Sequence, residues 1–222
     1  MRAGEVIPEI VSVISELRDG TEEVVNPPSI CPICSTKLEQ DEGKVAIYCP
    51  NSYCPAKIQG QFEMFVGKQG LNIDGLGIKQ IELFLELGWI SDFVSLFHLA
   101  SHKTELLQIE GYKEKSVNNL LEAIEKARHT TLDRVFVALG IPNVGKKTGK
   151  ILAEYIFLEK NNEESIMQVL LRLNNEALET IHDIGLETAT SIIEYIEKNG
   201  VLIERLLDEL SIFIPERKEK ML

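Results

Sequence analysis

Apolar residues recur at intervals of three and four along most of the chain beyond residue 59. Within residues 115–128, for instance, Val117, Leu120, Leu121 and Ile124 fall on one stripe of a helix. The same periodicity, interrupted by short breaks, predicts further helices at residues 79–87, 93–99, 131–139, 146–157, 163–171, 176–181, 187–197 and 201–210. The sequence therefore predicts a mainly α domain over residues 59–215, followed by a charged tail at residues 216–222.

The first residues follow a different pattern. Residues 4–8, 10–14 and 22–25 are rich in β-branched residues, which predicts strands. Pro8 restricts the first of these segments to a sheet edge or a bulge. Because so few strands cannot bury a core by themselves, we expect residues 1–27 to be the end of a β domain.

A short pattern is repeated four times in the helical part. Residues 73–77, Ile-Asp-Gly-Leu-Gly, describe a tight turn that opens directly into a helix. The pattern returns at residues 109–113, 141–145 and 181–185, so the copies begin 32 to 40 residues apart. One turn between two helices in each repeat is the helix–hairpin–helix pattern. It resembles the modules with which DNA repair and ligation proteins hold the backbone of duplex DNA.

Each turn offers a small cradle for an anion. Glycine permits positive φ and close approach, and the start of a helix leaves amide N–H groups without partners. Asn143 and Asp183 replace the first glycine in the last two copies, and these residue types tolerate left-handed geometry best. The residues that we expect to contact DNA are Gly75, Leu76, Gly77, Lys79, Gly111, Tyr112, Lys113, Asn143, Val144, Gly145, Lys146, Lys147 and Gly185.

The four copies differ in their expected binding to phosphate. The first and third keep the second glycine and are followed by lysine, whereas the second has Lys113 in place of that glycine. Asp183 and Glu187 lie near the mouth of the fourth, which either contacts DNA or only completes a structural pair with the third. The alternative is a set of glycine-terminated helices in an ordinary bundle, which explains one copy better than four in register.

The four cysteines lie within a short segment. Cys31 and Cys34 form one pair, Cys49 and Cys54 form the other, and a predicted hairpin at residues 37–48 separates them. This spacing lets four thiolates converge on a tetrahedral zinc ion, and with all positions filled by thiolate the zinc is structural. The sequence predicts a four-cysteine zinc finger at residues 28–58; the alternatives are four inert thiols or an iron–sulfur cluster.

Charge and motif content limit the possible functions. The formal net charge of −12 argues against a nucleic-acid binder, although lysines gather just after the first three hairpins. No pattern predicts a signal peptide or a membrane span. We find no catalytic constellation: the segment from Gly140 differs from a phosphate-binding P-loop, because Lys147 stands where the motif needs serine or threonine.

Three features occur in one order along the chain. They are Gly-Glu-Val-Ile-Pro at residues 4–8, the finger motifs Cys-Pro-x-Cys and Cys-Pro-Asn-x-x-Cys-Pro, and four hairpins that begin with Ile-Asp-Gly-Leu-Gly. Over nearly its whole length the chain resembles the C-terminal part of bacterial NAD-dependent DNA ligases. The resemblance implies the end of an OB-fold at residues 1–27, followed by the zinc finger and a helix–hairpin–helix domain. In that family, this domain grips nicked duplex DNA across the minor groove while an N-terminal domain performs the chemistry.

The resemblance also implies that several ligase domains are missing. We expect the adenylation domain, the nicotinamide-mononucleotide-binding domain, most of the OB-fold and the BRCT domain to be absent, so the chain alone has no catalytic residue and no ligase activity. NAD and Mg²⁺ would act only through the catalytic domain, in cis or in trans. The expected setting is DNA replication and repair in the bacterial cytosol, near the nucleoid and without a membrane partner. The alternative function is a protein-interaction adaptor with structural zinc, favoured by the net charge of −12.

Overall fold

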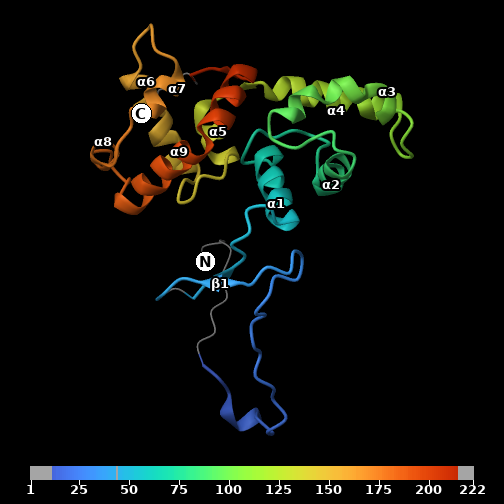
Figure 1. Cartoon of the computed structure of the whole chain (residues 1–222), viewed down its shortest axis with the longest axis vertical. Helices are drawn as coiled ribbons and strands as arrows, with labels where there is room; N and C mark the ends of the chain where they lie inside the picture. Colours follow the sequence, from blue (N-terminus) through green and yellow to red (C-terminus); the bar gives the residue numbers. More distant parts are fainter. Residues whose placement is uncertain (1–11, 44, 215–222) are drawn as a thin grey trace, which may run out of the picture. The chain divides into compact units, whose positions relative to one another are not determined.

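The computed structural model describes residues 12–43 and 45–214. The chain forms two compact units that divide between Asn51 and Ser52 (Figure 1). The first unit contains only short elements, whereas the second is built from helices. The predicted fold class, mainly α with a small β-containing finger, is confirmed.

The first unit contains the hairpin that the sequence predicts between the two cysteine pairs. Strand β1 (Glu39–Gln40) pairs antiparallel with β2 (Ile47–Tyr48), so that Glu39 lies opposite Tyr48. Gly43 has a φ of 76° in the connecting turn, a value that favours glycine. A short 3-10 helix, η1 (Ser15–Leu17), precedes the finger.

The predicted strand at residues 22–25 is wrong. This segment has no strand pairing, and the side chains of Val24 and Val25 are 83% and 93% exposed. A strand requires a neighbour to satisfy its backbone groups, and none of the described residues supplies one here. The strand expected at 4–8 and the first two residues of that expected at 10–14 lie outside the described residues. Residues 12–14 are described and form no strand. The end of an OB-fold at residues 1–27 stays a prediction.

The second unit consists of helices with two very short strands. In chain order these elements are α1 (Pro55–Val66), α2 (Ile78–Glu86), η2 (Ser95–His102), α3 (Lys103–Leu106), α4 (Glu114–Ala127), β3 (His129–Thr130), α5 (Leu132–Ala138), α6 (Lys146–Glu159), α7 (Ile166–Leu171), α8 (Asn175–Glu179), α9 (Leu186–Glu209) and β4 (Ser211–Ile212). Helices α2, α4, α6 and α9 each begin at the residue after one of the four hairpins.

One continuous core connects the helices of the second unit. Helix α1 packs against α2 and α5, α5 packs along α6, and α7 and α8 pack against α9 (Figure 1). Helix α1 contributes an apolar face to this core, because Phe62 and Phe65 are buried. Phe65 stacks on Phe93 with ring centroids 4.3 Å apart, and Phe62 meets the same ring edge-on at 5.3 Å.

Helix α9 corrects one sequence prediction. The break expected around Gly200 does not exist, because α9 runs through it as a single helix of 24 residues. A Cβ atom at Gly200 would lie 3.4 Å from the terminal methyl group of Met167 on α7. The glycine therefore does not end the helix, and a methyl group at this position would meet only the flexible end of one side chain.

The end of α9 is held by contacts that the sequence did not indicate. Strand β4 pairs in parallel with β3, so that Ser211 lies opposite His129. Arg128, at the end of α4, donates hydrogen bonds to the carboxylate of Glu209, to Glu125 and to the backbone oxygen of Phe97. His98 Nε2 also lies 3.0 Å from Glu209 Oε1. These contacts join the end of α9 to the middle of the helical unit, around residues 97–98 and 125–130, which lies far away in sequence.

Candidate metal centre and hairpin surface

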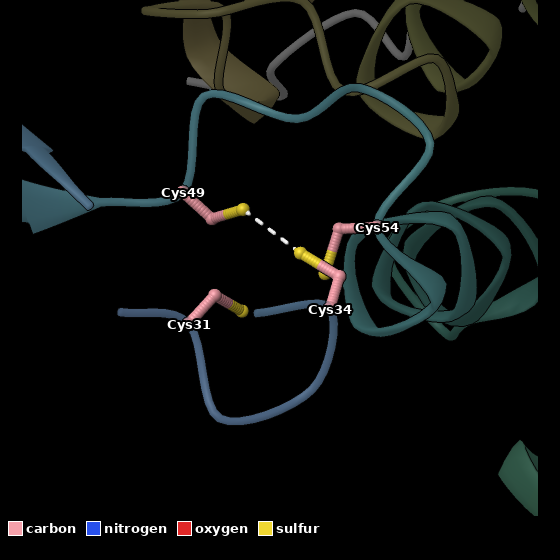
Figure 2. A group of neighbouring side chains, drawn as sticks. All are labelled: Cys31, Cys34, Cys49 and Cys54. Atoms are coloured by element: carbon pink, nitrogen blue, oxygen red, sulfur yellow. Dashed lines mark hydrogen bonds between the residues drawn. The ribbon is translucent and has the colours of Figure 1, made fainter. Parts of the chain in front are cut away.

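The four cysteine side chains point into one small volume (Figure 2). The Sγ atoms of Cys31, Cys34, Cys49 and Cys54 all lie within 4.8 Å of one another, and those of Cys34 and Cys49 are 3.5 Å apart. Cys31 and Cys54 are buried, and the other two are half-buried. The structure thus brings together all four residues that the sequence predicts as metal ligands.

Tight local turns position these side chains. The amide of Ser35 donates to the backbone oxygen of Cys31, and the amide of Cys31 donates to that of Thr36. Ser35 has a φ of 58°, which curls the backbone around the first pair. Cys54 is the N-cap of α1, and its carbonyl oxygen accepts bonds from the amides of Lys57 and Ile58.

The surroundings of the thiols favour a thiolate at one position. Thr36, whose Oγ1 lies 3.3 Å from Cys34 Sγ, lowers the pKa of the Cys34 thiol to about 6 through hydrogen bonds from its side chain and backbone. Desolvation instead raises the pKa of the Cys49 thiol to about 11. A bound cation would stabilise both as thiolates.

The donor set fits a structural zinc ion. Four sulfur atoms about 2.3 Å from a tetrahedral zinc lie about 3.8 Å from one another, which agrees with mutual separations within 4.8 Å. Since four thiolates fill a tetrahedral shell, a catalytic water would have no position. These cysteines are suited to holding a zinc ion, and the role of such an ion would be to stabilise the finger.

The four hairpins share one backbone geometry. In each, the amide of the fourth residue donates to the carbonyl oxygen of the first, over 3.0 to 3.3 Å. The third residue has positive φ every time: 82° at Gly75, 91° at Gly111, 64° at Asn143 and 70° at Asp183. The expectation that Asn143 and Asp183 take over the left-handed position of glycine is confirmed.

The fifth residue of each hairpin is the N-cap of the following helix. Its φ lies between −89° and −106°, which is extended backbone that any residue adopts, as Lys113 shows. A Cβ atom at Gly145 or Gly185 would have no protein atom within 4 Å, and one at Gly77 would approach only the side chain of Gln80. Neither backbone conformation nor internal packing therefore requires glycine at this position, and each of these glycines leaves room for close approach from outside.

The fourth residue of each hairpin anchors the turn. Leu76, Val144 and Ile184 are buried, and Tyr112 is half-buried with its ring 6.4 Å from that of Phe84. Because the side chains of Leu76 and Val144 are buried, only the backbone atoms of these two residues can contact DNA, whereas half-buried Tyr112 keeps part of its side chain exposed. The sequence pattern did not distinguish residues that offer a side chain to DNA from residues that offer only backbone atoms.

In the first two hairpins, the amide of the N-cap residue donates a hydrogen bond to a side chain of the same helix. The amide of Gly77 donates to Oε1 of Gln80 over 3.2 Å, and the amide of Lys113 donates to Oγ of Ser116 over 2.9 Å. Among the described residues, the amides of Gly145 and Gly185 have no such bond. The third and fourth hairpins consequently keep their N-cap amides as open donors, whereas the first and second do not.

The lysines predicted to contact DNA differ in their surroundings. Lys79, Lys113 and Lys146 are exposed and form no ion pair within the described chain. Lys147, in contrast, places Nζ 2.7 Å from Oδ2 of Asp183 in the fourth hairpin. Sequence reasoning missed this contact, because the two residues belong to different repeats.

The third and fourth hairpins also meet through Asn143, whose Nδ2 donates to Oγ of Ser191 over 3.0 Å. The ion pair with Lys147 lowers the pKa of the Asp183 carboxyl, and His182, with Nδ1 3.4 Å from Oδ1, acts in the same direction. Contact between the third hairpin and the fourth, one of the two alternatives considered for the fourth hairpin, is therefore present in the structure.

Within the part of the chain that the structure describes, no helix has the length and apolar character needed to cross a membrane.

Comparison with protein families gives two matches. Residues 31–56, which include all four cysteines, match the NAD-dependent DNA ligase C4 zinc finger domain. Residues 134–202, which include the third and fourth hairpins, match the helix-hairpin-helix motif.

Comparison with curated proteins finds proteins named DNA ligase. The chain is 41% identical over 210 residues to one from Fusobacterium nucleatum. The aligned region covers 94% of this chain and 29% of the relative. The chain is 41% identical over 210 residues to one from Halalkalibacterium halodurans (95% and 30%) and 42% identical over 208 residues to one from Thermosipho africanus (92% and 30%). The chain thus spans less than a third of the length of these relatives.

Proposed function

The chain shares its C4 zinc finger and its helix–hairpin–helix region with the C-terminal part of NAD-dependent DNA ligases, and from this premise we propose that it grips nicked duplex DNA by the backbone. The grip lies across the minor groove and serves a ligase that seals nicks in replication and repair. The adenylation domain, in cis or in trans, is the partner that supplies the chemistry with NAD and Mg²⁺. The protein acts in the bacterial cytosol, close to the nucleoid.

One observation carries the proposal. The four hairpins repeat a single backbone geometry that presents the start of a helix, and the glycines at the fifth position of three of them serve no internal need. Amides at a helix start, together with an open approach, suit a phosphate group. Because such contacts read the phosphate backbone, they carry no base information, and binding has little sequence preference.

The contribution of each hairpin differs in this proposal. The third hairpin is the strongest phosphate holder, because it combines the open amide of Gly145 with the exposed Lys146. The first and second contribute mainly through Lys79 and Lys113, since their N-cap amides bond to Gln80 and Ser116. The zinc held by the four cysteines keeps the finger folded and takes no part in chemistry.

A protein-interaction adaptor is the second candidate function. The net charge of −12 and the carboxylate of Asp183 beside Lys147 favour it, because both oppose binding of a polyanion. The two functions differ in salt dependence. Phosphate contacts release counterions, so that DNA affinity falls steeply as the salt concentration rises.

The test is fluorescence anisotropy of a nicked duplex titrated with zinc-loaded protein at several salt concentrations. Lys146→Glu is expected to lower the affinity about tenfold or more, because it replaces a phosphate contact by a repulsive charge. The control is Lys160→Glu, which makes the same charge change about 20 Å away, beyond the other end of α6. Equal effects of the two substitutions, or binding that salt does not weaken, would overturn the proposal and favour the adaptor.

A further inference from the structure

Lys147 and Asp183 form an ion pair between the third and fourth hairpins. Lys147 is the second residue of α6, and its ammonium group lies 2.7 Å from Oδ2 of Asp183 in the fourth hairpin. The other oxygen of Asp183 lies 3.4 Å from Nδ1 of His182. One carboxylate thus faces a lysine of the neighbouring hairpin and the histidine beside it.

The turn does not require a carboxylate at this position. Asp183 has a φ of 70°, and the equivalent residues of the other hairpins are Gly75, Gly111 and Asn143, which hold the same geometry without charge. The negative charge of Asp183 therefore has no role in shaping the backbone.

Stability does not explain the carboxylate either. The side chains of Lys147 and Asp183 are 77% and 37% exposed. Ion pairs as exposed as this one contribute little to stability, because water screens the charges and two side chains lose freedom. What the pair does change is the charge that Lys147 presents to a ligand.

We propose that Asp183 is an internal counter-ion that competes with DNA phosphate for Lys147 and so weakens the grip of the third hairpin. The inference rests on the proposed function. A phosphate that recruits Lys147 must break an existing ion pair and leave the Asp183 carboxylate beside another anion. Lys146, the preceding residue, forms no ion pair within the described chain and binds phosphate without this competition.

This arrangement sets the affinity of the protein for DNA below the value that Lys147 alone would give. A clamp that serves a ligase has to release the sealed duplex, and a weakened contact shortens the time for which the product stays bound. Asp183 thereby limits affinity at the hairpin that otherwise has the best phosphate site.

Asp183→Asn tests the inference with little structural change. Asparagine is isosteric, it tolerates positive φ, and it already occupies the equivalent position as Asn143. We expect nicked-duplex affinity to rise about three- to tenfold at low salt. The slope of log affinity against log salt should steepen by about 0.9, because one more phosphate is neutralised.

A double-mutant cycle with Lys147→Gln shows whether the effect passes through the lysine. In the wild-type background Lys147→Gln should lower affinity by no more than the general effect of one charge, which Glu187→Gln measures, because Asp183 already occupies the ammonium group. In the Asp183→Asn background the same change should remove the whole gain. Independent, additive effects of the two substitutions would overturn the inference.

Glu187→Gln is the matched control, because it removes one negative charge at the same hairpin from a residue that forms no ion pair within the described chain. A general reduction of repulsion would make Glu187→Gln and Asp183→Asn equivalent, which would also overturn the inference. Thermal unfolding of each variant verifies that the fold is kept.

The two proposals fail in different ways. If neither the wild-type protein nor any variant binds the duplex, the proposed function fails and the inference with it. If the wild-type protein binds in a salt-sensitive manner and Asp183→Asn binds no more tightly, only the inference fails.

Discussion

Arg128 joins distant parts of the helical unit through one guanidinium group. It bonds to Glu125 on its own helix, to Glu209 at the end of α9 and to the carbonyl oxygen of Phe97, whose ring lies 5.0 Å from the guanidinium carbon. Arginine suits this place because its planar donors satisfy several acceptors at once. No local pattern around Arg128 indicates the role, because Glu209 lies far along the chain.

The Glu209 carboxylate gives the unit a testable pH dependence. Arg128 lowers the pKa of Glu209 below its ordinary value of 4.5, and the neighbouring His98 acts in the same direction. A depressed pKa contributes stability above pH 4.5, and this stability is lost as the pH falls through the folded-state pKa. In urea unfolding, Glu209→Gln should cost about 1.5 to 3 kcal/mol at pH 7, since it removes a hydrogen bond to a charged group.

The difference between Glu209→Gln and the wild-type protein should shrink as the pH falls below 4.5, where the wild-type carboxyl becomes protonated. The isosteric change Glu204→Gln on the same helix, at an exposed position, is the control and should leave stability nearly unchanged. A difference that stays constant with pH would contradict the role of the Glu209 charge.

At the scale of whole elements, two glycines inside helices serve different contacts. A Cβ atom at Gly149 in α6 would lie 3.1 Å from the backbone oxygen of Asp133 on α5, which cannot move aside easily. A Cβ atom at Gly200 in α9 would meet only the flexible end of Met167 at 3.4 Å. The first glycine permits the close packing of α5 on α6, whereas the second leaves space that a methyl group can enter.

These two glycines predict opposite effects of the same substitution. Gly200→Ala should stabilise the protein by up to about 1 kcal/mol, because alanine loses less backbone entropy in a helix. Gly149→Ala should destabilise it by about 1 to 3 kcal/mol, because the added methyl overpacks a buried contact. Denaturant unfolding of both variants measures the two values. Destabilisation by both would show that the Met167 side chain cannot adjust.

At the scale of the molecule, the finger and the helical unit rely on different sources of stability. The described elements between the cysteine pairs are two strands of two residues each, with mostly exposed side chains. The helical unit has one continuous core that begins at Phe62. Such a small finger cannot bury enough apolar surface to fold by itself, so a bound metal has to contribute.

Removal of zinc should therefore act on the finger and leave the helices. We expect about one zinc per chain by elemental analysis, with the four thiols protected from a thiol reagent until a chelator is added. Far-UV circular dichroism should then change little, because the helical core lies outside the finger. A collapse of the helical signal on chelation, or bound iron in place of zinc, would contradict this prediction.

The sequence alone indicated much of the fold and of the candidate site. The cysteine spacing identified the four side chains that the structure gathers, because short loops leave little choice of arrangement. The hairpin pattern located the positive φ positions at Asn143 and Asp183, because few residue types tolerate that geometry. Helical periodicity placed most helices, since each buries one face against the core.

Other features were decided only when the chain folded. The uninterrupted course of α9 through Gly200 depends on packing against α7, and the absence of a strand at residues 22–25 depends on the lack of a neighbour among the described residues. The pairing of β3 with β4 and the ion pair between Lys147 and Asp183 join residues from different repeats.

What the sequence by itself determined was local: metal-ligand spacing, turn geometry and helix periodicity act over a few neighbouring residues. What only the tertiary structure decided was the environment of each charge. An ion pair depends on the distance between atoms in space, and the folded core sets that distance for residues such as Lys147 and Asp183, which belong to different hairpins.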